Sequence, residues 1–251
     1  MTPDETEAEV KKLVKEIKNG MHSDEAEHWI FAPEAGTAVK RVIFVFGVPA
    51  SMNFYEGKCK IGMCPRAREH LNAVSRDGNG TVLVVLNPIV IFPHKVKDIT
   101  RGNDWWFTRL SSVVTEDEAS LISCVEAINL SVDKIMKELK IQPENTYFFG
   151  NGNRIGGLAA ASALSRPEKF GGVILVDSPL VNRRKVANGD VFTNKETPVH
   201  LILTRDCSKG LTAITEVVLK AKGVTVTRSF TDSFEFGALS EALNELMFVP
   251  E

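Results

Sequence analysis

The sequence predicts a single α/β domain built on a doubly wound, mostly parallel β-sheet flanked by helices. Three observations lead to this fold class. Seven short apolar runs are rich in β-branched residues, helical patterns separate these runs, and a length of 251 residues suits one large α/β domain. The later runs are continuously apolar, which is typical of strands buried on both faces of a parallel sheet, so the helices belong in the crossover connections.

The first expected element is an amphipathic helix that ends at Gly20. Its apolar residues recur at helical spacing, and they are Val10, Leu13, Val14 and Ile17. We therefore expect residues 1–27 to form an N-terminal helical appendage and residues 28–251 to form the main domain, an α/β unit in which strands and helices alternate.

The expected strands of the main domain are Trp29–Ala32, Val42–Phe46, Val82–Leu86, Thr146–Phe149, Val173–Val176, Val199–Leu203 and Val224–Phe230. The expected helices are Arg66–Ser75, Asp117–Leu139, Arg154–Ser165, Leu211–Ala221 and Ala238–Met247. An irregular stretch from Asn87 to Glu116 interrupts the alternation, and loops of this length are often functional. Its aromatic residues, Trp105, Trp106 and Phe107, either anchor the loop or contribute to a protein-binding surface, where tryptophan is enriched.

Composition and charge exclude several kinds of partner and ligand. The formal net charge is -2, which gives no electrostatic drive toward nucleic acid or an anionic membrane. No apolar run reaches the length of about 18 residues that a membrane-spanning helix needs. The acidic N-terminus lacks the apolar core of a signal peptide, so we expect a cytoplasmic protein. The spacing of Cys59, Cys64 and His70 matches no common zinc pattern, and we expect neither a metal nor a cofactor.

The most informative segment runs from Tyr147 to Ala161 and reads as a strand, a glycine-rich turn and a helix of small residues. One chemistry that uses this shape is the nucleophile elbow, G-x-S-x-G, whose tight turn presents a serine at the edge of the sheet. Here Gly152, Arg154 and Gly156 occupy its first, third and fifth positions. Arginine therefore stands in the place of the serine, and no G-x-S-x-G occurs elsewhere in the chain.

A dinucleotide-binding loop is the second chemistry that fits the segment. Gly150, Gly152 and Gly156 form G-x-G-x-x-x-G, and Asp177 follows about 20 residues later, where an acid would bind a ribose. In dinucleotide-binding folds, however, this loop usually follows the first strand, whereas here it follows a late one. A dinucleotide-binding protein is thus one alternative function.

Five segments resemble the acyl-protein thioesterase and carboxylesterase family of α/β hydrolases. Val42–Val48 is similar to the family's first core strand and oxyanion turn, and Asn103–Thr108 is similar to its P-S-W-F-D segment. Glu116–Ala119 is similar to the acidic stretch before a long helix. Phe148–Ala161 is similar to the elbow and its helix, and Thr197–Leu203 is similar to the strand before the catalytic aspartate. The resemblance extends over about residues 28 to 248 in the family's order, and it implies the α/β-hydrolase fold.

The same resemblance implies that the catalytic residues are missing. A hydrolase of this family uses a nucleophile, an acid and a base in the chain order Ser, Asp, His. Arg154 stands at the nucleophile position, and the other two positions carry Asp206 or Cys207 for the acid and Phe234 or Glu235 for the base. A guanidinium is always protonated and cannot attack an acyl carbon. No histidine follows His200, so the base is absent as well.

The oxyanion turn also departs from the family. Its His-Gly is replaced by Phe46-Gly47, and Pro49 has no backbone N–H to donate. Changes at four separate elements indicate that hydrolysis is absent. The alternative is an active carboxylesterase or thioesterase with a rearranged site, for which the candidate residues are Ser51, His94, Ser178 and Cys207.

We therefore expect a non-catalytic protein that serves as a binding or structural subunit, with protein partners in a larger complex. The altered elbow still offers a helix N-terminus, which favours anions. A small anionic ligand would contact Arg154 in a pocket formed by Val48, Trp106, Gly152, Asn153, Ile155 and Gly156. Alternatively an internal acid neutralises Arg154, because an unpaired buried charge is costly. We favour this second interpretation, and the candidate acids are Asp206, Asp232 and Glu235.

Overall fold

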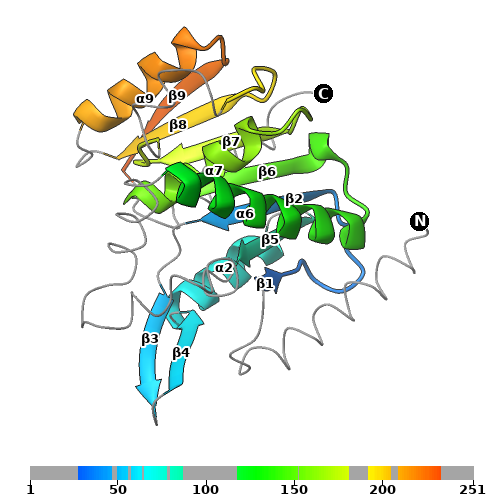
Figure 1. Cartoon of the computed structure of the whole chain (residues 1–251). Coiled ribbons are helices and arrows are strands. Elements are labelled where there is room, and N and C mark those ends of the chain that lie inside the picture. Colours follow the sequence, from blue (N-terminus) through cyan, green and yellow to red (C-terminus); the bar gives the residue numbers. More distant parts are fainter. Residues whose placement is uncertain are drawn as a thin grey trace.

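The fold class predicted from the sequence is confirmed. The computed structural model of the chain describes residues 28–46, 50–55, 58–63, 65–77, 80–86, 118–151, 153–180, 192–204 and 209–232. Within these ranges a seven-stranded, mostly parallel sheet carries helices on both faces (Figure 1). Three expected elements lie outside the described residues, namely the appendage of residues 1–27, the irregular stretch Asn87–Glu116 and the helix Ala238–Met247.

The strands of the sheet lie in the order β1-β5-β2-β6-β7-β8-β9. Their bounds are β1 His28–Phe31, β2 Arg41–Phe46, β5 Thr81–Leu86, β6 Thr146–Asn151, β7 Gly172–Val176, β8 Val199–Thr204 and β9 Val226–Thr231. The pair β1–β5 is antiparallel, and every other neighbouring pair in this sheet is parallel. All seven strands agree with their sequence-based expectations to within two residues at each end.

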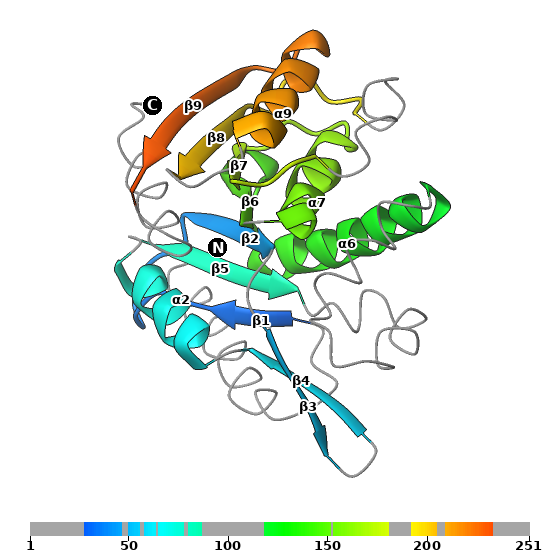
Figure 2. The same ribbon diagram turned by 90° about the vertical axis from the view of Figure 1, so that its left-hand side faces the viewer.

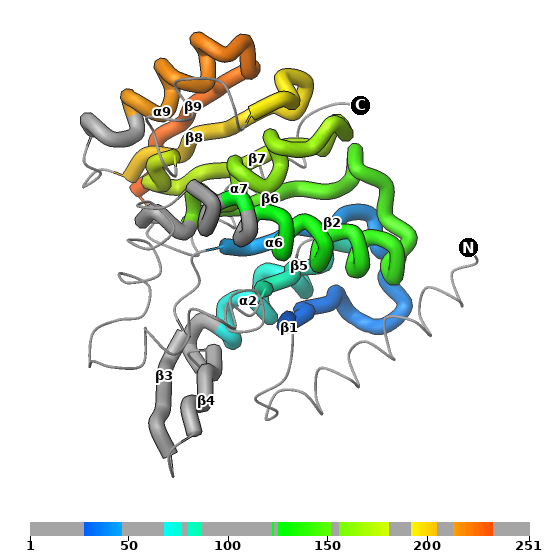
Figure 3. Tube along the Cα trace, viewed as in Figure 1, coloured from blue at the N-terminus to red at the C-terminus, as the bar shows by residue number. Residues whose placement is uncertain are grey.

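The described helices are α2 Pro65–Asp77, α6 Glu118–Leu139, α7 Asn153–Leu164 and α9 Lys209–Ala221, with a short 3-10 helix, η1, at Pro143–Asn145. Buried residues of α6, α7 and α9 join the hydrophobic cluster on one face of the sheet, whereas those of α2 join the cluster on the other (Figure 2). From β2 the chain moves outward to β5, then α6 carries it back past β2 to β6 (Figure 3). The four strands from β6 to β9 then follow one another toward the opposite edge.

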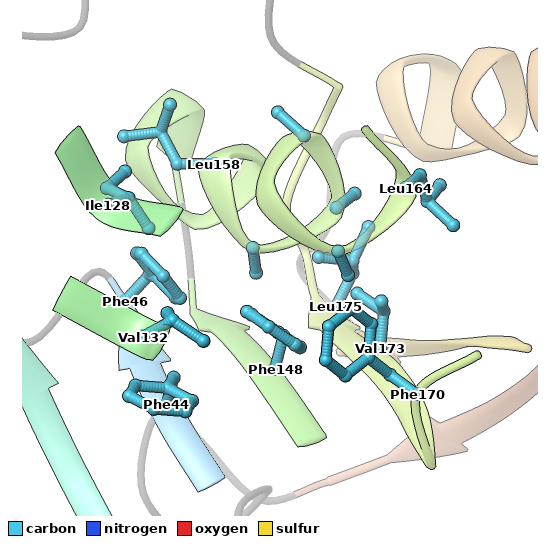
Figure 4. Close-up of a cluster of buried hydrophobic side chains, with 14 of the residues drawn as sticks. Phe44, Phe46, Ile128, Val132, Phe148, Leu158, Leu164, Phe170, Val173 and Leu175 are labelled. Atoms are coloured by element: carbon cyan, nitrogen blue, oxygen red, sulfur yellow. The ribbon is translucent and has the colours of Figure 1, made fainter. Parts of the chain in front are cut away.

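The two hydrophobic clusters form the core. On the face covered by α6 and α7, the rings of Phe44 and Phe148 stack with centroids 5.6 Å apart, and Phe170 meets Phe148 edge-on at 5.0 Å (Figure 4). Small residues let α7 approach the sheet closely, and they are Ala159, Ala160, Ala161 and Ala163. On the face of α2, Phe149 and Leu71 belong to the second cluster. Successive residues of β6 therefore reach opposite faces, as a strand buried on both sides requires.

A β-hairpin that the sequence analysis missed follows β2. Its strands are β3, Ala50–Tyr55, and β4, Lys58–Met63, and they form a separate antiparallel sheet. The register pairs Met52 with Ile61 and Phe54 with Cys59, so apolar residues of both strands lie opposite one another. This alternation was the signal that could have identified the hairpin, because a period of two is the mark of a strand.

No helix in the described part of the chain is both long enough and apolar enough to cross a membrane.

Candidate functional site

The sheet topology points to the ends of β2 and β6. These strands are neighbours, and the chain leaves them in opposite directions: after β2 it leads to β5 through α2 on one face, and after β6 it leads to β7 through α7 on the other. In open α/β sheets ligands bind outside the carboxyl ends of the strands at such a switch point. The candidate site therefore lies where β2 and β6 end.

Both strands end at the same level of the sheet. Phe46, the last residue of β2, pairs with Gly150 of β6, and β6 continues one residue further to Asn151. Helix α7 begins at Asn153, so a single residue, Gly152, separates the strand from the helix along the chain. This is the strand–turn–helix order that the sequence pattern predicted. It brings the last residues of β2 and the first residues of α7 to one edge of the sheet.

Two glycines allow the close packing of this turn. A β-carbon on Gly150 would lie 2.1 Å from the carbonyl oxygen of Gly156, a distance that no side chain tolerates. A β-carbon on Gly156 would lie 2.1 Å from the Oγ atom of Ser178 and 3.0 Å from the backbone nitrogen of Asn151. The first turn of α7 is therefore held against the end of β6 and against the segment that follows β7, and only glycine fits at either position.

Asp177 ties the end of β7 to the end of β8. It follows β7 directly and has a φ of 47°, in the left-handed region that few residues other than glycine adopt. One oxygen of its carboxylate accepts a hydrogen bond from the backbone N–H of Thr204 at 3.0 Å, and the other accepts one from the Thr204 hydroxyl. Beside it, the buried Ser178 hydroxyl donates to the carbonyl oxygen of Val176 at 3.0 Å. Residues with unusual backbone geometry are concentrated at functional sites.

The edge of the sheet at this end is lined by buried polar residues that the sequence analysis did not single out as a group. Thr204 ends β8 and pairs with Thr231, which ends β9. Both are buried, as are Asn151 and Ser178. Asn151, Ser178 and Thr204 stand at or just after the end of an apolar run. That position was the signal that could have identified them, because the carboxyl ends of parallel strands meet at one edge.

The predicted site residues divide into three groups. Asn153, Arg154 and Ile155 belong to the first turn of α7, and Gly156 follows them there. Asp232 follows β9 and is exposed. The other seven lie outside the described residues, and they are Val48, Trp106, Gly152, Asp206, Cys207, Phe234 and Glu235. Among the residues weighed for a rearranged site, Ser51 belongs to β3, whereas His94 also lies outside the described residues.

His200 is placed far from this edge. It is the second residue of β8, so about 13 Å of extended strand separates it from the end at Thr204. Its Nδ1 atom lies 2.8 Å from the Thr227 hydroxyl and its Nε2 atom 2.9 Å from the Ser229 hydroxyl, both on β9. The last histidine of the sequence therefore takes part in a contact between two strands and does not face the elbow.

Two sources of positive charge meet at the start of α7, namely the helix N-terminus and Arg154. The N-terminus of the 12-residue helix α7 carries unsatisfied backbone N–H groups and a partial positive charge, which favour an anion. Arg154 is the second residue of that helix and adds a full positive charge to the sequence at this point. A helix N-terminus of this kind favours a carboxylate or phosphate.

The shifted pKa values in the described part of the chain belong to groups away from this turn. Arg166, beyond the far end of α7, donates hydrogen bonds to Glu168 at 3.2 and 3.3 Å and to Asp133 at 2.6 Å. The bonds from Arg166 hold the pKa of the Glu168 carboxyl below its usual value. Among the described residues no group of three or more His, Cys, Asp or Glu side chains is arranged to hold a metal ion.

Comparison with known proteins supports the fold and nothing beyond the fold. No protein-family model matches the chain, and the search of curated proteins found no relative. Among solved structures, a Bacillus cereus carboxylesterase is 18% identical, with a TM-score of 0.57 over 92% of this chain and 98% of its own. A phospholipase/carboxylesterase from Dyadobacter fermentans is 15% identical, with a TM-score of 0.56 over 91% of this chain and 100% of its own. Arabidopsis thaliana SOBER1 is 21% identical over 52% of this chain and 66% of its own, at a TM-score of 0.42.

The α/β-hydrolase fold expected from the sequence is therefore confirmed, because two carboxylesterase structures match nearly the whole chain. At identities below one fifth the match concerns architecture, and this architecture hosts many unrelated functions.

Proposed function

We propose that this protein is a non-catalytic member of the acyl-protein thioesterase and carboxylesterase family, acting as a binding or structural subunit of a larger cytoplasmic assembly. One observation carries the proposal. In the sequence Arg154 takes the third position of G-x-S-x-G, where an elbow carries its nucleophile, and the order of strand β6, Gly152 and helix α7 supports this alignment. The two glycines of the motif are kept in the sequence, whereas its serine is not.

The packing around the turn supports a retained elbow and argues against a relocated one. Gly150 contacts Gly156, and Gly156 contacts Ser178, so the backbone has no room for a larger residue. Ser178 itself is fully buried and donates to a backbone carbonyl oxygen, which leaves it a poor substitute nucleophile. A hydrolase needs an exposed hydroxyl within reach of a base.

The absence of a base supports the same conclusion. Strand β9 ends at Thr231, and the sequence after it contains no histidine. His200 lies near the start of β8 and interacts with Thr227 and Ser229. Restoring a serine at the elbow would therefore leave that serine unactivated.

For the pocket itself we propose that Arg154 is neutralised by an internal acid. Strands β8 and β9 both end at the edge where α7 begins, and the candidate acids follow these ends in the sequence: Asp206, Asp232 and Glu235. An ion pair would fill the site, because an arginine without a partner is costly to bury. A small anionic ligand at Arg154, in the pocket of Val48, Trp106, Gly152, Asn153, Ile155 and Gly156, is the alternative occupant.

The two other candidate functions have less support. An active esterase would need a nucleophile–base pair, and it predicts labelling by a serine-reactive fluorophosphonate. A dinucleotide site would need Asp177 for the ribose, but both oxygens of that carboxylate already accept hydrogen bonds from Thr204. Its glycine-rich turn also follows the central strand β6 and not the first strand of the sheet. We expect no thermal shift with nicotinamide or adenine dinucleotides.

The test is the native size of the protein in extract from its source, with identification of the proteins that co-migrate. The control is the purified chain on the same column. A stoichiometric complex larger than the purified protein supports the subunit role and names the partners. Equal sizes in extract and in purified form would overturn that role.

A further inference from the structure

The edge of the sheet formed by β9 is a surface that suits a partner. β8 pairs with one side of β9, and no strand in the described ranges pairs with the other side (Figure 2). An edge strand offers a row of backbone N–H and C=O groups to any chain that can add a strand.

The direction of these groups follows from one hydrogen bond. The backbone N–H of Val199 in β8 donates to the carbonyl oxygen of Thr225, just before β9, at 2.9 Å. Since successive residues of a strand point their backbone groups to alternate sides, Thr227, Ser229 and Thr231 also face β8. The backbone groups of Val226, Arg228 and Phe230 therefore face outward from the sheet.

This edge carries few of the features that usually prevent pairing. Natural edge strands carry charged side chains, proline or bulges, whereas β9, Val-Thr-Arg-Ser-Phe-Thr, has a single charged residue and no proline. Its aromatic residue, Phe230, is 71% exposed. Its one charged residue, Arg228, is bonded to Glu216 of α9 at 3.2 Å, and its guanidinium carbon lies 6.0 Å from the centre of the Phe230 ring. The charge is thus partly compensated and held over an exposed aromatic surface.

We propose that the occupant of this edge is a second copy of the chain, which pairs β9 with β9 in an antiparallel ladder about a two-fold axis at Ser229. The register follows from the outward groups, because outward residues must pair with outward residues. One such register places Arg228 opposite the partner's Arg228, and like charges directly opposite are destabilising. Another places Phe230 opposite the partner's Phe230, but it overlaps only the last three residues of β9.

A third register places Arg228 opposite the partner's Phe230, twice by symmetry. Each of these two pairs exchanges two backbone hydrogen bonds, so the ladder contains about four. Arginine over an aromatic ring is an attractive pair, and on the other face Thr227 lies opposite the partner's Thr231. Such a contact is self-complementary, as a two-fold dimer requires, and it joins two seven-stranded sheets into one. The proposal is independent of the subunit role, since it concerns the purified chain alone.

Sedimentation of the full-length purified protein tests the surface and the register together. We expect wild-type dimers, and we expect Phe230→Lys to weaken dimerisation about 100-fold because it sets a lysine opposite the partner's Arg228. Phe230→Glu should leave the dimer intact, because a carboxylate there meets the same arginine. Val217→Lys, on an α9 residue that is 67% exposed, is the control for adding a lysine elsewhere and should have no effect. Melting temperatures of all variants verify folding.

Crosslinking through a cysteine at the two-fold axis is the second measurement. Ser229→Cys sets two thiols opposite each other at a spacing that a disulfide can bridge, whereas Thr227→Cys does not. We expect a crosslinked dimer on a non-reducing gel for the first variant only, above the background of the native cysteines in the wild-type lane. A monomeric wild-type chain would overturn the proposal and leave this edge to a strand from a different protein. A dimer that tolerates Phe230→Lys would overturn it equally.

Discussion

Gly150 at the end of β6 and Gly156 in the first turn of α7 are in direct backbone contact. A β-carbon on the first would lie 2.1 Å from the carbonyl oxygen of the second. The strand and the helix that leaves it are therefore closer than any pair of side-chain-bearing residues would allow. This contact sets the shape of the turn in which Arg154 replaces the expected serine.

The first prediction concerns this contact. Gly150→Ala should destabilise the protein by about 3 kcal/mol, because the clash is with backbone and the strand is fixed on both sides. Gly172→Ala is the matched control in the neighbouring strand β7, where a β-carbon would meet its nearest atom at 3.5 Å. It should change stability by less than about 1 kcal/mol. Urea unfolding of both variants gives the comparison, and equal effects would contradict the role assigned to Gly150.

The second prediction couples Gly156 to Ser178. Gly156→Ala places a methyl group 2.1 Å from the Ser178 Oγ atom and should destabilise by about 2 kcal/mol. Because that atom belongs to a side chain, Ser178→Ala should partly restore stability in the double variant. A double-mutant cycle measures the coupling. Additive effects would show that the clash is relieved elsewhere.

The third prediction concerns chemistry. Arg154→Ser rebuilds the sequence G-x-S-x-G, yet it should produce neither ester hydrolysis nor fluorophosphonate labelling, because no histidine follows His200. Single-turnover assays with a thioester and an aryl ester provide the measurement. Activity in this variant would mean that a base exists and that the protein lost its function through one substitution.

The fourth prediction separates two features of Asp177, its hydrogen bonds to Thr204 and its positive φ. Asp177→Gly removes its hydrogen bonds to Thr204 but tolerates the positive φ, whereas Asp177→Ala removes the bonds and adds backbone strain. The alanine variant should be less stable than the glycine variant by about 1 kcal/mol. Asp177→Asn should be the mildest of the three, because asparagine tolerates this backbone region and keeps one acceptor oxygen.

The fifth prediction is a pH dependence. Hydrogen bonds from Arg166 lower the pKa of Glu168 in the folded protein, so this carboxylate contributes stability above its unfolded pKa of about 4.3. That contribution is lost as the pH falls through the lower, folded pKa. Glu168→Gln should therefore be less stable than wild type at neutral pH, by less than about 1 kcal/mol because the side chain is partly exposed, and the two should converge in acid.

The control for this pH dependence is the Arg166→Met background. Without the guanidinium, Glu168→Gln should have a much smaller pH-dependent effect on stability. Thermal melts from pH 3 to 7 on the four proteins, run in one buffer series, measure both differences.

The sheet was accessible from the sequence because most of its strands are continuous apolar runs with one dominant pattern. Segments such as Val82–Leu86 and Val173–Val176 are buried on both faces, so no alternative structure satisfies their side chains. The elbow was accessible for a related reason, since Gly152 and Gly156 flank the start of a small-residue helix. The helix after the glycine-rich turn begins at Asn153, within one residue of the expected start at Arg154.

The parts that escaped prediction depend on contacts between distant segments. The hairpin of β3 and β4 was missed although Met52, Phe54, Cys59 and Ile61 alternate with other residues, because each strand is short and charged or small residues interrupt it. The bond between Asp177 and Thr204 joins residues from different strands, and no local pattern encodes it. The same residue had been considered for a ribose on spacing alone.

The position of β2 beside β6 has a consequence for how the chain reaches its native state. Val42 pairs with Thr146, so the central ladder joins segments about one hundred residues apart, whereas β6 to β9 are connected by much shorter crossovers. Closing a loop of that length costs about 4 kcal/mol of chain entropy before the ladder gains anything in return. We therefore expect the half from β6 to β9 to assemble first during folding. The turn that contains Arg154 would gain its neighbour β2 in the slowest step, and hydrogen exchange of the Phe44 and Phe148 amides would report that step.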